Sequence, residues 1–263
     1  MIYEVKRMAK SVSNMMFKNL FSRPKAEDIK VINGRRQKIP FAGDNCDDCG
    51  HCAEACPSKA ITIDGVWTMN AGKCISCLEC VDVCKKNAVE IIDGPDYVLD
   101  RSELIFKRGG PKERVCGKIN AEKMKAIGRS IHIREVDTGS CNSCEVEVNS
   151  LSNQFYDVER FGIKIVASPR HADVLLITGP VTENMHLALT KVVAATPNPK
   201  VIIAMGVCAI SGGMFADGNV VGEGIKDTVD VDIFIPGCPP SPDRLIRTLL
   251  NAFGLSNNDD RTS

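Results

Sequence analysis

The stretch CDDCGHCAEACP at residues 46–57 and the stretch CISCLECVDVC at residues 74–84 share one cysteine spacing, C-x-x-C-x-x-C-x-x-x-C. The first three cysteines of such a run can converge on one cubane cluster from a single tight turn, while the fourth ligand comes from elsewhere. Both runs continue in the same way, as CPSKAITI at residues 56–63 and CKKNAVEI at residues 84–91. This duplication predicts an α+β unit of two pseudo-symmetric halves, each with a turn, a cysteine-bearing segment and a short strand.

In two-cluster ferredoxins the fourth cysteine of each run binds the cluster of the other run. Applied to this sequence, that rule predicts two [4Fe–4S] clusters. Pro57 follows the first run as in that family, whereas Lys85 stands at the matching position of the second run, a difference that bears on the local backbone and not on ligation. The predicted ligands are Cys46, Cys49, Cys52 and Cys84 for the first cluster, and Cys74, Cys77, Cys80 and Cys56 for the second.

A third set of cysteines is dispersed over the second half of the chain. Cys141 and Cys144 lie between a predicted strand at 130–136 and a predicted helix at 143–155, Cys208 follows a strand at 201–205, and Cys238 follows a strand at 233–235. Open α/β sheets bind ligands at the carboxyl ends of their strands, so we expect these thiols to hold a third [4Fe–4S] cluster. Glycines in the same loops would let the backbone approach that cluster: Gly206, Gly212, Gly213 and Gly237.

The alternation of apolar runs and helical segments predicts a flavodoxin-like, doubly wound parallel sheet for the second half. Further strands are expected at 163–167 and 174–178, and further helices at 183–195 and 241–253. The whole chain is divided into four segments. They are an amphipathic helix with its lead-in at 1–35, a two-cluster ferredoxin-like domain at 36–95, a polar linker with one short helix at 96–128, and the α/β domain at 129–263.

Composition limits the class of protein. With 263 residues the chain can form two domains, and its net charge of zero gives no electrostatic case for nucleic acid. A cysteine-rich secreted scaffold would need a signal peptide, and the start of this chain lacks an apolar core of that kind, so reduced thiols in the cytoplasm are expected. The basic amphipathic segment at 1–25 favours docking on a membrane or a membrane-embedded partner. The alternatives are a helix packed on its own protein and a frayed end.

Other interpretations of the cysteines were weighed. Zinc also suits C-x-x-C pairs, but no histidine lies at ligand spacing in this duplicated pattern. Cys141 and Cys144 alone could be a thioredoxin-like redox pair, an interpretation that the placement of Cys208 and Cys238 disfavours. A flavin site is disfavoured because the loops carry cysteines in place of a phosphate-binding run. Cys116 is interpreted as a spare thiol and His51 as a solvent-facing residue.

Residues 130–255 resemble the small-subunit family shared by [NiFe] hydrogenases and respiratory complex I. The resemblance rests on DTGSCNSCEVE, ERFGIKIVASPRHADVLLITG, GVCAISGG and IPGCPP. Residues 36–95 resemble the two-cluster ferredoxin subunit of the same complexes, so the chain resembles those two subunits fused. Complex I subunits have adjacent cysteines at the first ligand position. Here Asn142 and Ser143 separate Cys141 from Cys144, which favours the group 4 membrane-bound and formate hydrogenlyase-type hydrogenases, although a glycine is frequent where Ser143 stands.

The resemblance implies an electron relay of three [4Fe–4S] clusters and no catalytic residue on this chain. The nickel–iron centre would lie on a large partner subunit, with membrane-arm subunits as further partners and a ferredoxin or formate dehydrogenase as redox partner. The complex would sit on the cytoplasmic face of the cell membrane. Glu145 and Glu147 are candidates for proton transfer or an interface, the alternative being ordinary acids at a helix N-terminus. Family-matching or isolated polar residues interpreted as structural are Arg170, His171, Asp173, His132 and His186.

Two other functions stay open. One is a complex I-like module that passes electrons to a quinone or to sulfur compounds. The other is a stand-alone iron–sulfur electron carrier without a catalytic partner, for which a third cluster domain and an amphipathic start have little use.

Overall fold

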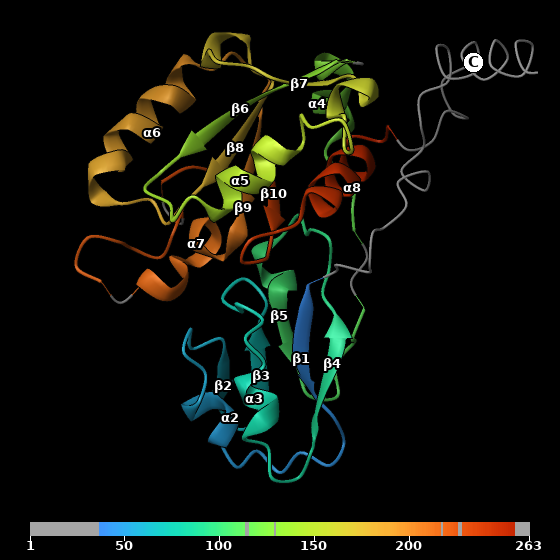
Figure 1. Cartoon of the computed structure of the whole chain (residues 1–263), viewed down its shortest axis with the longest axis vertical. Helices are drawn as coiled ribbons and strands as arrows, with labels where there is room; N and C mark the ends of the chain where they lie inside the picture. Colours follow the sequence, from blue (N-terminus) through green and yellow to red (C-terminus); the bar gives the residue numbers. More distant parts are fainter. Residues whose placement is uncertain (1–36, 114–115, 129, 217, 226–227, 256–263) are drawn as a thin grey trace, which may run out of the picture.

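The computed structural model describes residues 37–255, except 114–115, 129, 217 and 226–227. These residues form a small α+β module and, stacked on it, a larger α/β module (Figure 1). The helix predicted at 1–25 lies outside the described residues. Within the described part of the chain, no helix has both the length and the apolar character needed to cross a bilayer.

The small module contains two antiparallel strand pairs that reproduce the sequence repeat. β1 pairs with β4, and β2 pairs with β3, so each half contributes one strand before and one after its cysteine run. The strands are β1 (Lys38–Ala42), β2 (Ile61–Ile63), β3 (Trp67–Asn70) and β4 (Val89–Asp93). The duplicated α+β unit predicted from the sequence is confirmed.

Each cysteine run of the small module turns into one short helix. α2 (His51–Glu54) begins after Gly50, and α3 (Glu79–Asp82) begins after Leu78. Both preceding residues have left-handed backbone, with φ of 87° and 67° respectively. This sharp turn reverses the chain between the second and third cysteines of each run, which brings them to the same side of the loop.

The segment after β4 is more than the linker that the sequence analysis expected. Val98 pairs with Phe234 of the α/β module, and the chain then returns through the short helix η3 (Arg101–Leu104) to β5 (Ile105–Lys107), which pairs with β3. The sequence analysis did not find β5 because its three residues lie among charged neighbours. Two apolar side chains nevertheless hold it in the core, since Leu104 and Phe106 are fully buried. α4 (Ala121–Ile127) follows where a short helix was expected.

The α/β module is built on one sheet of parallel strands. The order is β10-β9-β8-β6-β7, and every neighbouring pair is parallel. In chain order this is the 2-1-3-4-5 arrangement of flavodoxin-like sheets, so the predicted fold class is confirmed. The strands are β6 (Ile131–Asp137), β7 (Ile163–Ile165), β8 (Val174–Thr178), β9 (Val201–Met205) and β10 (Ile233–Ile235).

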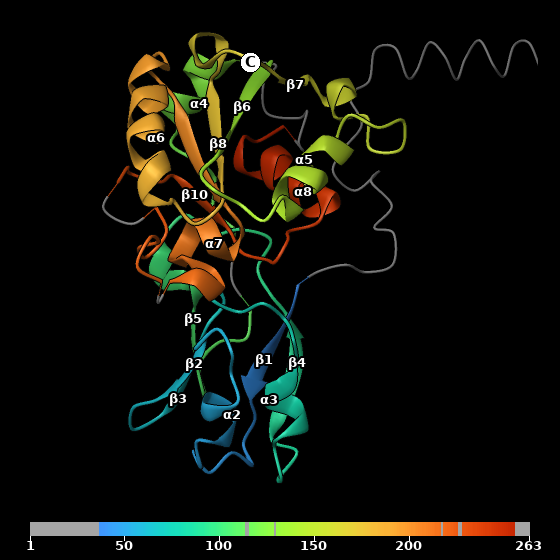
Figure 2. The same cartoon turned by 60° about the vertical axis from the view of Figure 1, so that its left-hand side comes forward.

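Helices cover both faces of this sheet. α6 (Glu183–Ala195) lies on one face, and α5 (Ser143–Ser150) and α8 (Pro242–Ala252) lie on the other (Figures 1 and 2). α7 (Gly206–Ser211) was not predicted, because the sequence analysis assigned the residues after β9 to a loop, and it lies between the sheet and the small module. Short 3-10 helices occur at η4 (Val158–Phe161), η5 (Pro169–His171) and η6 (Gly213–Phe215).

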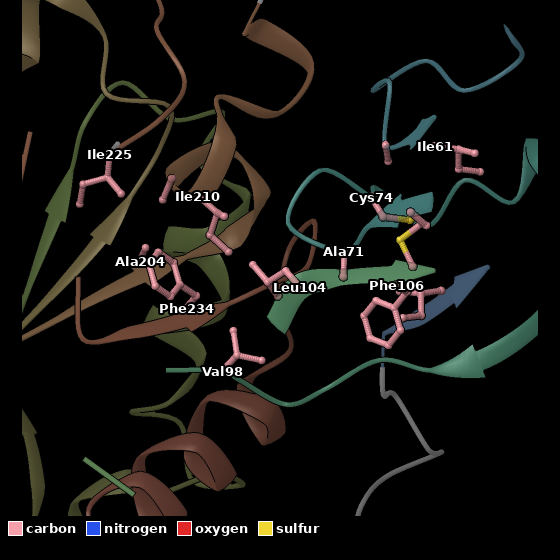
Figure 3. Packing of buried hydrophobic residues seen from close by; sticks show 14 of the residues in the cluster. Ile61, Ala71, Cys74, Val98, Leu104, Phe106, Ala204, Ile210, Ile225 and Phe234 are labelled. Atoms are coloured by element: carbon pink, nitrogen blue, oxygen red, sulfur yellow. The ribbon is translucent and has the colours of Figure 1, made fainter. Parts of the chain in front are cut away.

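Alternate residues of the central strand β8 serve two different cores. Val174 and Leu176 pack into the core beneath α5 and α8, whereas Leu175 and Ile177 face the side of α6. The core on the α6 side, which contains Leu175 and Ile177, extends beyond the sheet. It continues through Ile210 and other residues into the small module (Figure 3). The two modules therefore share one hydrophobic core, and apolar burial of this kind stabilises their relative position.

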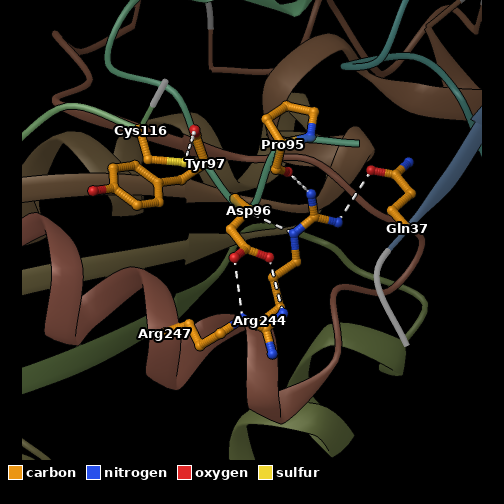
Figure 4. Close-up of polar contacts among 7 residues, drawn as sticks. All are labelled: Gln37, Pro95, Asp96, Tyr97, Cys116, Arg244 and Arg247. Atoms are coloured by element: carbon orange, nitrogen blue, oxygen red, sulfur yellow. Dashed lines mark hydrogen bonds and ion pairs between the residues drawn. The ribbon is translucent and has the colours of Figure 1, made fainter. Parts of the chain in front are cut away.

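A buried polar joint adds to this contact where the chain leaves β4 (Figure 4). Arg244 of α8 is 1% exposed; its Nε donates to the carbonyl of Asp96 at 2.9 Å, and its guanidinium also donates to the Pro95 carbonyl and to Gln37. Arg247, one turn further along, binds the Asp96 carboxylate through two nitrogen atoms at 2.9 and 3.0 Å. Two arginines of the α/β module thus bind the segment through which the chain leaves β4 of the small module.

Candidate metal centres

The first set of thiols surrounds the start of α2. Cys46, Cys49 and Cys52 come from the first run, and Cys84 reaches them from the end of α3. All four line one cavity of about 190 Å³. Cys49 is exposed at its mouth, whereas Cys52 is buried. Burial raises the pKa of the Cys52 thiol, and the neighbouring thiols of Cys46 and Cys49 raise it further.

The second set is buried more deeply. Burial raises the pKa of Cys74 to about 11, and Cys56 and Cys77 add to the shift. The pKa of Cys80 rises to about 12, first through burial and then through the thiols of Cys74 and Cys56. Cys56 of the first run therefore lies among the cysteines of the second run, as Cys84 lies among those of the first.

The two crossing cysteines are held in the same way. The backbone N–H of Ala60 donates to the Cys56 sulfur at 3.2 Å, and that of Ala88 donates to the Cys84 sulfur at 3.2 Å. Hydrogen bonds of this kind favour a thiolate over a thiol and fix the direction in which its sulfur points. The sequence repeat therefore extends to the hydrogen bonds that hold the two crossing cysteines.

The third set assembles at the carboxyl ends of three strands. Cys141 follows β6, Cys144 lies in the first turn of α5, Cys208 lies in α7 directly after β9, and Cys238 follows β10. Burial raises the pKa of Cys208 to about 12, and Cys238 and Cys141 raise it further. Burial also raises the pKa of Cys144, with Glu145 and then Cys208 and Cys238 adding to the effect. Cys208 was expected in a loop and belongs to a helix instead.

Two glycines make room for the sulfur atoms of the third set. A Cβ atom at Gly206 would lie 2.8 Å from the Cys144 sulfur, and one at Gly213 would lie 2.9 Å from the Cys208 sulfur. Both residues also have left-handed backbone, with φ of 88° and 57°. Any larger residue would have to displace a thiol, so the space and the backbone both call for glycine.

The second and third sets are connected by a direct contact between the modules. The Ser211 hydroxyl, at the end of α7, donates to the carbonyl of Gly72 at 2.8 Å, and both residues are buried. Gly72 lies just before Cys74, and Ser211 lies just after Cys208. The sulfur of Cys52 also acts on Cys80, so the first and second sets are neighbours. The three sets therefore follow one another through the protein interior.

Two acidic residues lie beside the third set. Glu145 is 8% exposed, and neither of its carboxylate oxygens has a hydrogen-bond partner among the residues that the structure describes. Burial raises the pKa of Glu135 on β6 to about 7, with Glu145 as the next cause. Glu147 is half-buried on the same helix as Glu145. Both helix acids were predicted as candidates from the sequence, but Glu135 was not, because it lies between Arg134 and Asp137 in a strand of mixed polarity.

The remaining residues named from the sequence lie apart from the thiols, with one exception. Asp173 accepts the backbone N–H of His132 at 3.0 Å and lies 3.0 Å from its ring, which is a structural contact between strands β6 and β8. Arg170, His171 and His186 are exposed. The exception is His51, which is exposed but has its Nδ1 atom 3.2 Å from the Cys49 sulfur.

Cys116 is the thirteenth cysteine and belongs to none of the three sets. Its thiol donates to the Tyr97 carbonyl at 3.3 Å (Figure 4), and burial raises its pKa. This environment is that of a protonated, packed thiol.

The donor atoms suit iron–sulfur clusters. Four thiols in each set are the ligands that [4Fe–4S] clusters require, and each set has at least one exposed cysteine. Among the described residues, no three His, Cys, Asp or Glu side chains are arranged to hold a single metal ion. A cubane binds each thiolate through a different iron atom, so its thiolates need not converge on one point.

Known proteins match both modules. Residues 45–89 match the 4Fe-4S dicluster domain, and residues 141–252 match the NADH ubiquinone oxidoreductase, 20 kDa subunit, family. A probable membrane-bound hydrogenase subunit, mbhJ, of Pyrococcus furiosus is 42% identical over 133 residues, which are 51% of this chain and 80% of that protein. The chain belongs to the NADH ubiquinone oxidoreductase 20 kDa subunit family.

Two other relatives are similarly close. An uncharacterized protein of Methanocaldococcus jannaschii is 48% identical over 122 residues, covering 46% of this chain and 82% of that protein. Formate hydrogenlyase subunit 7 of Escherichia coli is 44% identical over 137 residues, covering 52% of this chain and 54% of that protein. The chain therefore spans about half the length of the formate hydrogenlyase subunit. In the 20 kDa family match, the third set of cysteines is included from Cys141 onward.

Proposed function

We propose that this chain is the electron-transfer subunit of a membrane-associated [NiFe] hydrogenase complex. It would relay electrons through three [4Fe–4S] clusters between a low-potential redox partner and a large subunit that holds the nickel–iron centre. The observation that carries the proposal is the arrangement of twelve thiols in three successive sets of four within two modules that share one core. Two relatives support a hydrogenase complex in particular, because one is named a probable membrane-bound hydrogenase subunit and the other a formate hydrogenlyase subunit.

The roles of the residues follow from their positions. Clusters bound in the three sets would supply one-electron transfer at low potential. Cys46, Cys49, Cys52 and Cys84 would hold the outermost cluster, because the second set follows the contact of Gly72 with Ser211 of the α/β module and the third set lies within that module. Buried cysteines such as Cys74 and Cys80 would keep water from the second cluster.

The third set would face the catalytic partner. Cys141 and Cys238 are exposed at the carboxyl edge of the sheet, where a large subunit can cover them. Membrane-arm subunits, and a ferredoxin or formate dehydrogenase as redox partner, belong to the same proposal, as does a peripheral position on the cytoplasmic face of the membrane. No residue of this chain would bind nickel.

Glu145 is the candidate for proton transfer at this interface, with Glu147 beside it. Burying a carboxylate without a described hydrogen-bond partner is costly, and a role in function would explain why Glu145 is kept there. Glu145→Gln in the assembled complex should slow hydrogen turnover and hydrogen–deuterium exchange. Unchanged rates of both would remove the proton-transfer role and leave the electron relay intact.

The proposed function is tested on the complete complex, purified under anaerobic conditions. Iron and sulfide analysis with EPR should give three [4Fe–4S] clusters on this chain, all reducible by hydrogen gas. Zinc in place of iron, or only two clusters, would overturn the three-cluster relay. Reduction by a quinol or by sulfide, with none by hydrogen, would favour the complex I-like module, and a chain isolated without partners would favour a stand-alone carrier.

A further inference from the structure

The small module contains a buried polar atom without a partner, the indole nitrogen of Trp67. The Trp67 side chain is fully buried on β3, and its Nε1–H has no hydrogen-bond partner among the described residues. Leaving a buried N–H without an acceptor destabilises the folded state. An aromatic residue such as phenylalanine would fill the core without that cost, so the nitrogen calls for an explanation.

The surroundings of Trp67 identify the missing acceptor. Its side chain lines the same cavity as the first set of thiols, Cys46, Cys49, Cys52 and Cys84. Cys52, the buried thiol of that set, lines this cavity together with the indole. A cluster held by these thiols would bring sulfur acceptors into the cavity that the indole lines.

The backbone of Trp67 is fastened to the loop that carries these thiols. Its N–H donates to the Asp48 carboxylate at 3.0 Å, and its carbonyl accepts the N–H of Arg108 at 3.0 Å. The Arg108 guanidinium in turn donates to Asp48 and to the Cys46 carbonyl, each at 2.6 Å. The indole and the cysteine loop are thus held in one rigid unit, which is what a fixed hydrogen bond needs.

The other half of the repeat has no tryptophan at the position that matches Trp67. Cys46 and Cys74 occupy matching positions 28 residues apart, and the residue that matches Trp67 by the same interval is Ile39. Ile39 is also fully buried, but its side chain has no polar atom. A hydroxyl does lie by the second set, and the buried Ser76 Oγ also has no hydrogen-bond partner among the described residues, but it belongs to the cysteine loop itself. The tryptophan therefore distinguishes two otherwise similar sites.

We propose that the indole N–H of Trp67 donates a hydrogen bond to the Cys52 side of the first iron–sulfur cluster and raises its reduction potential relative to the second. A donor at the cluster sulfur stabilises the reduced form, which carries one more negative charge. This inference rests on the proposed function, since it needs a cluster in the first set. It makes the outermost cluster the easier of the two to reduce, so an electron arriving from a partner would be held there.

The direct test uses the fact that Trp67 is the single tryptophan of the sequence. Labelling the full-length chain with indole-¹⁵N tryptophan introduces one labelled side-chain nitrogen. Pulsed EPR of the reduced chain should then show a ¹⁵N coupling on one cluster signal that is absent from unlabelled protein. This measurement needs no substitution, so it does not depend on whether a variant folds.

The second test is the Trp67→Phe variant, which keeps an aromatic ring and removes the N–H. Redox titration followed by EPR should show one cluster shifted to a more negative potential and two clusters unchanged. Phe41→Leu is the matched control, because Phe41 packs edge-on against Trp67 with ring centroids 6.1 Å apart and offers no donor. The control should leave all three potentials in place.

The outcomes separate the two proposals. If three clusters assemble but no ¹⁵N coupling is seen, or if Trp67→Phe leaves every potential unchanged, the donor role is wrong and the electron relay stands. An equal shift in Phe41→Leu would mean that packing sets the potential, which also overturns the donor role. If the chain binds no iron, the proposed function fails first and the donor role fails with it.

Discussion

The small module and the α/β module gather their cysteines in opposite ways. In the small module, three thiols of each set come from one loop and its short helix, and only the fourth crosses from the other half. In the α/β module, the thiols come from the ends of three strands that are far apart in the sequence. The first arrangement depends mainly on local backbone, whereas the second exists only when the whole sheet has formed.

This difference has a physical consequence for how each region tolerates change. The short runs fix their own turns through left-handed residues such as Gly50 and Leu78, so small shifts elsewhere leave three sulfur positions intact. In the third set only Cys141 and Cys144 share such a turn, at Asn142 with φ of 68°, and Gly206 and Gly213 leave almost no space beside its sulfur atoms. We therefore expect substitutions to separate the regions clearly.

The largest effect is expected from Cys84→Ser, which tests the crossing in the small module. Cys84 lies in the second run, but its sulfur lines the cavity of the first set. Its removal should abolish the first cluster and leave the second, whereas Cys80→Ser should abolish the second. EPR with iron counting on each purified variant would show it. Loss of the same cluster in both variants would break the proposed exchange of ligands between the runs.

The next effect concerns the α/β module alone. Gly206→Ala would place a Cβ atom 2.8 Å from the Cys144 sulfur, on a backbone with φ of 88°. The third cluster should be lost or labile, while the first two keep their EPR signals. Gly65→Ala is the matched control, because Gly65 has φ of 70° but no atom near its added Cβ. It should cost about 1 kcal/mol of stability and no cluster; a full third cluster in Gly206→Ala would contradict the role of that glycine.

In both regions the sequence predicted the elements that have a local pattern and missed those that depend on tertiary burial. The short cysteine runs encode their geometry in their spacing, so the repeat and one short strand in each half could be expected from residues 36–95, whereas the second strand of each half and the short helices α2 and α3 were not. The parallel sheet was also predictable, since buried strands such as 174–178 are continuous apolar runs. β5 and α7 were missed because each is short and owes its form to tertiary burial, as Phe106 and Ile210 show.

What sequence could not supply is the contact between distant parts. No local pattern in the sequence relates the residues that join the two modules. Arg244 and Arg247 bind Asp96 after β4, and Ser211 donates to Gly72. Glu135 and Trp67 were missed for a similar reason. Their surroundings, not their immediate neighbours in sequence, make their polar atoms unusual.

A smaller effect is expected at the joint between the regions. Asp96 and Arg247 form a two-nitrogen ion pair with side chains only 13% and 10% exposed. Asp96→Ala leaves Arg247 buried without its partner and should lower the free energy of unfolding by about 3 kcal/mol. Thermal or denaturant unfolding would measure it. Asp93→Ala is the control, since its pair with Lys38 is about half exposed and should contribute well under 1 kcal/mol. Equal losses would show that the joint does not hold the modules together.

The smallest effect should depend on pH and be confined to the α/β module. Burial and the nearby Glu145 raise the pKa of Glu135 from 4.5 to about 7. The folded state then resists ionisation of Glu135, so this carboxyl destabilises the protein increasingly as pH rises from 4.5 to about 7 and by a constant amount above that. Glu135→Gln should therefore stabilise the protein more at pH 8.5 than at pH 5.5, by about 1 kcal/mol once partial solvent screening is allowed for. Unfolding measured at both pH values would show the difference, with the exposed Glu159→Gln as control. A gain independent of pH would mean that packing, not the charge of Glu135, limits the stability of the sheet beside the third set of thiols.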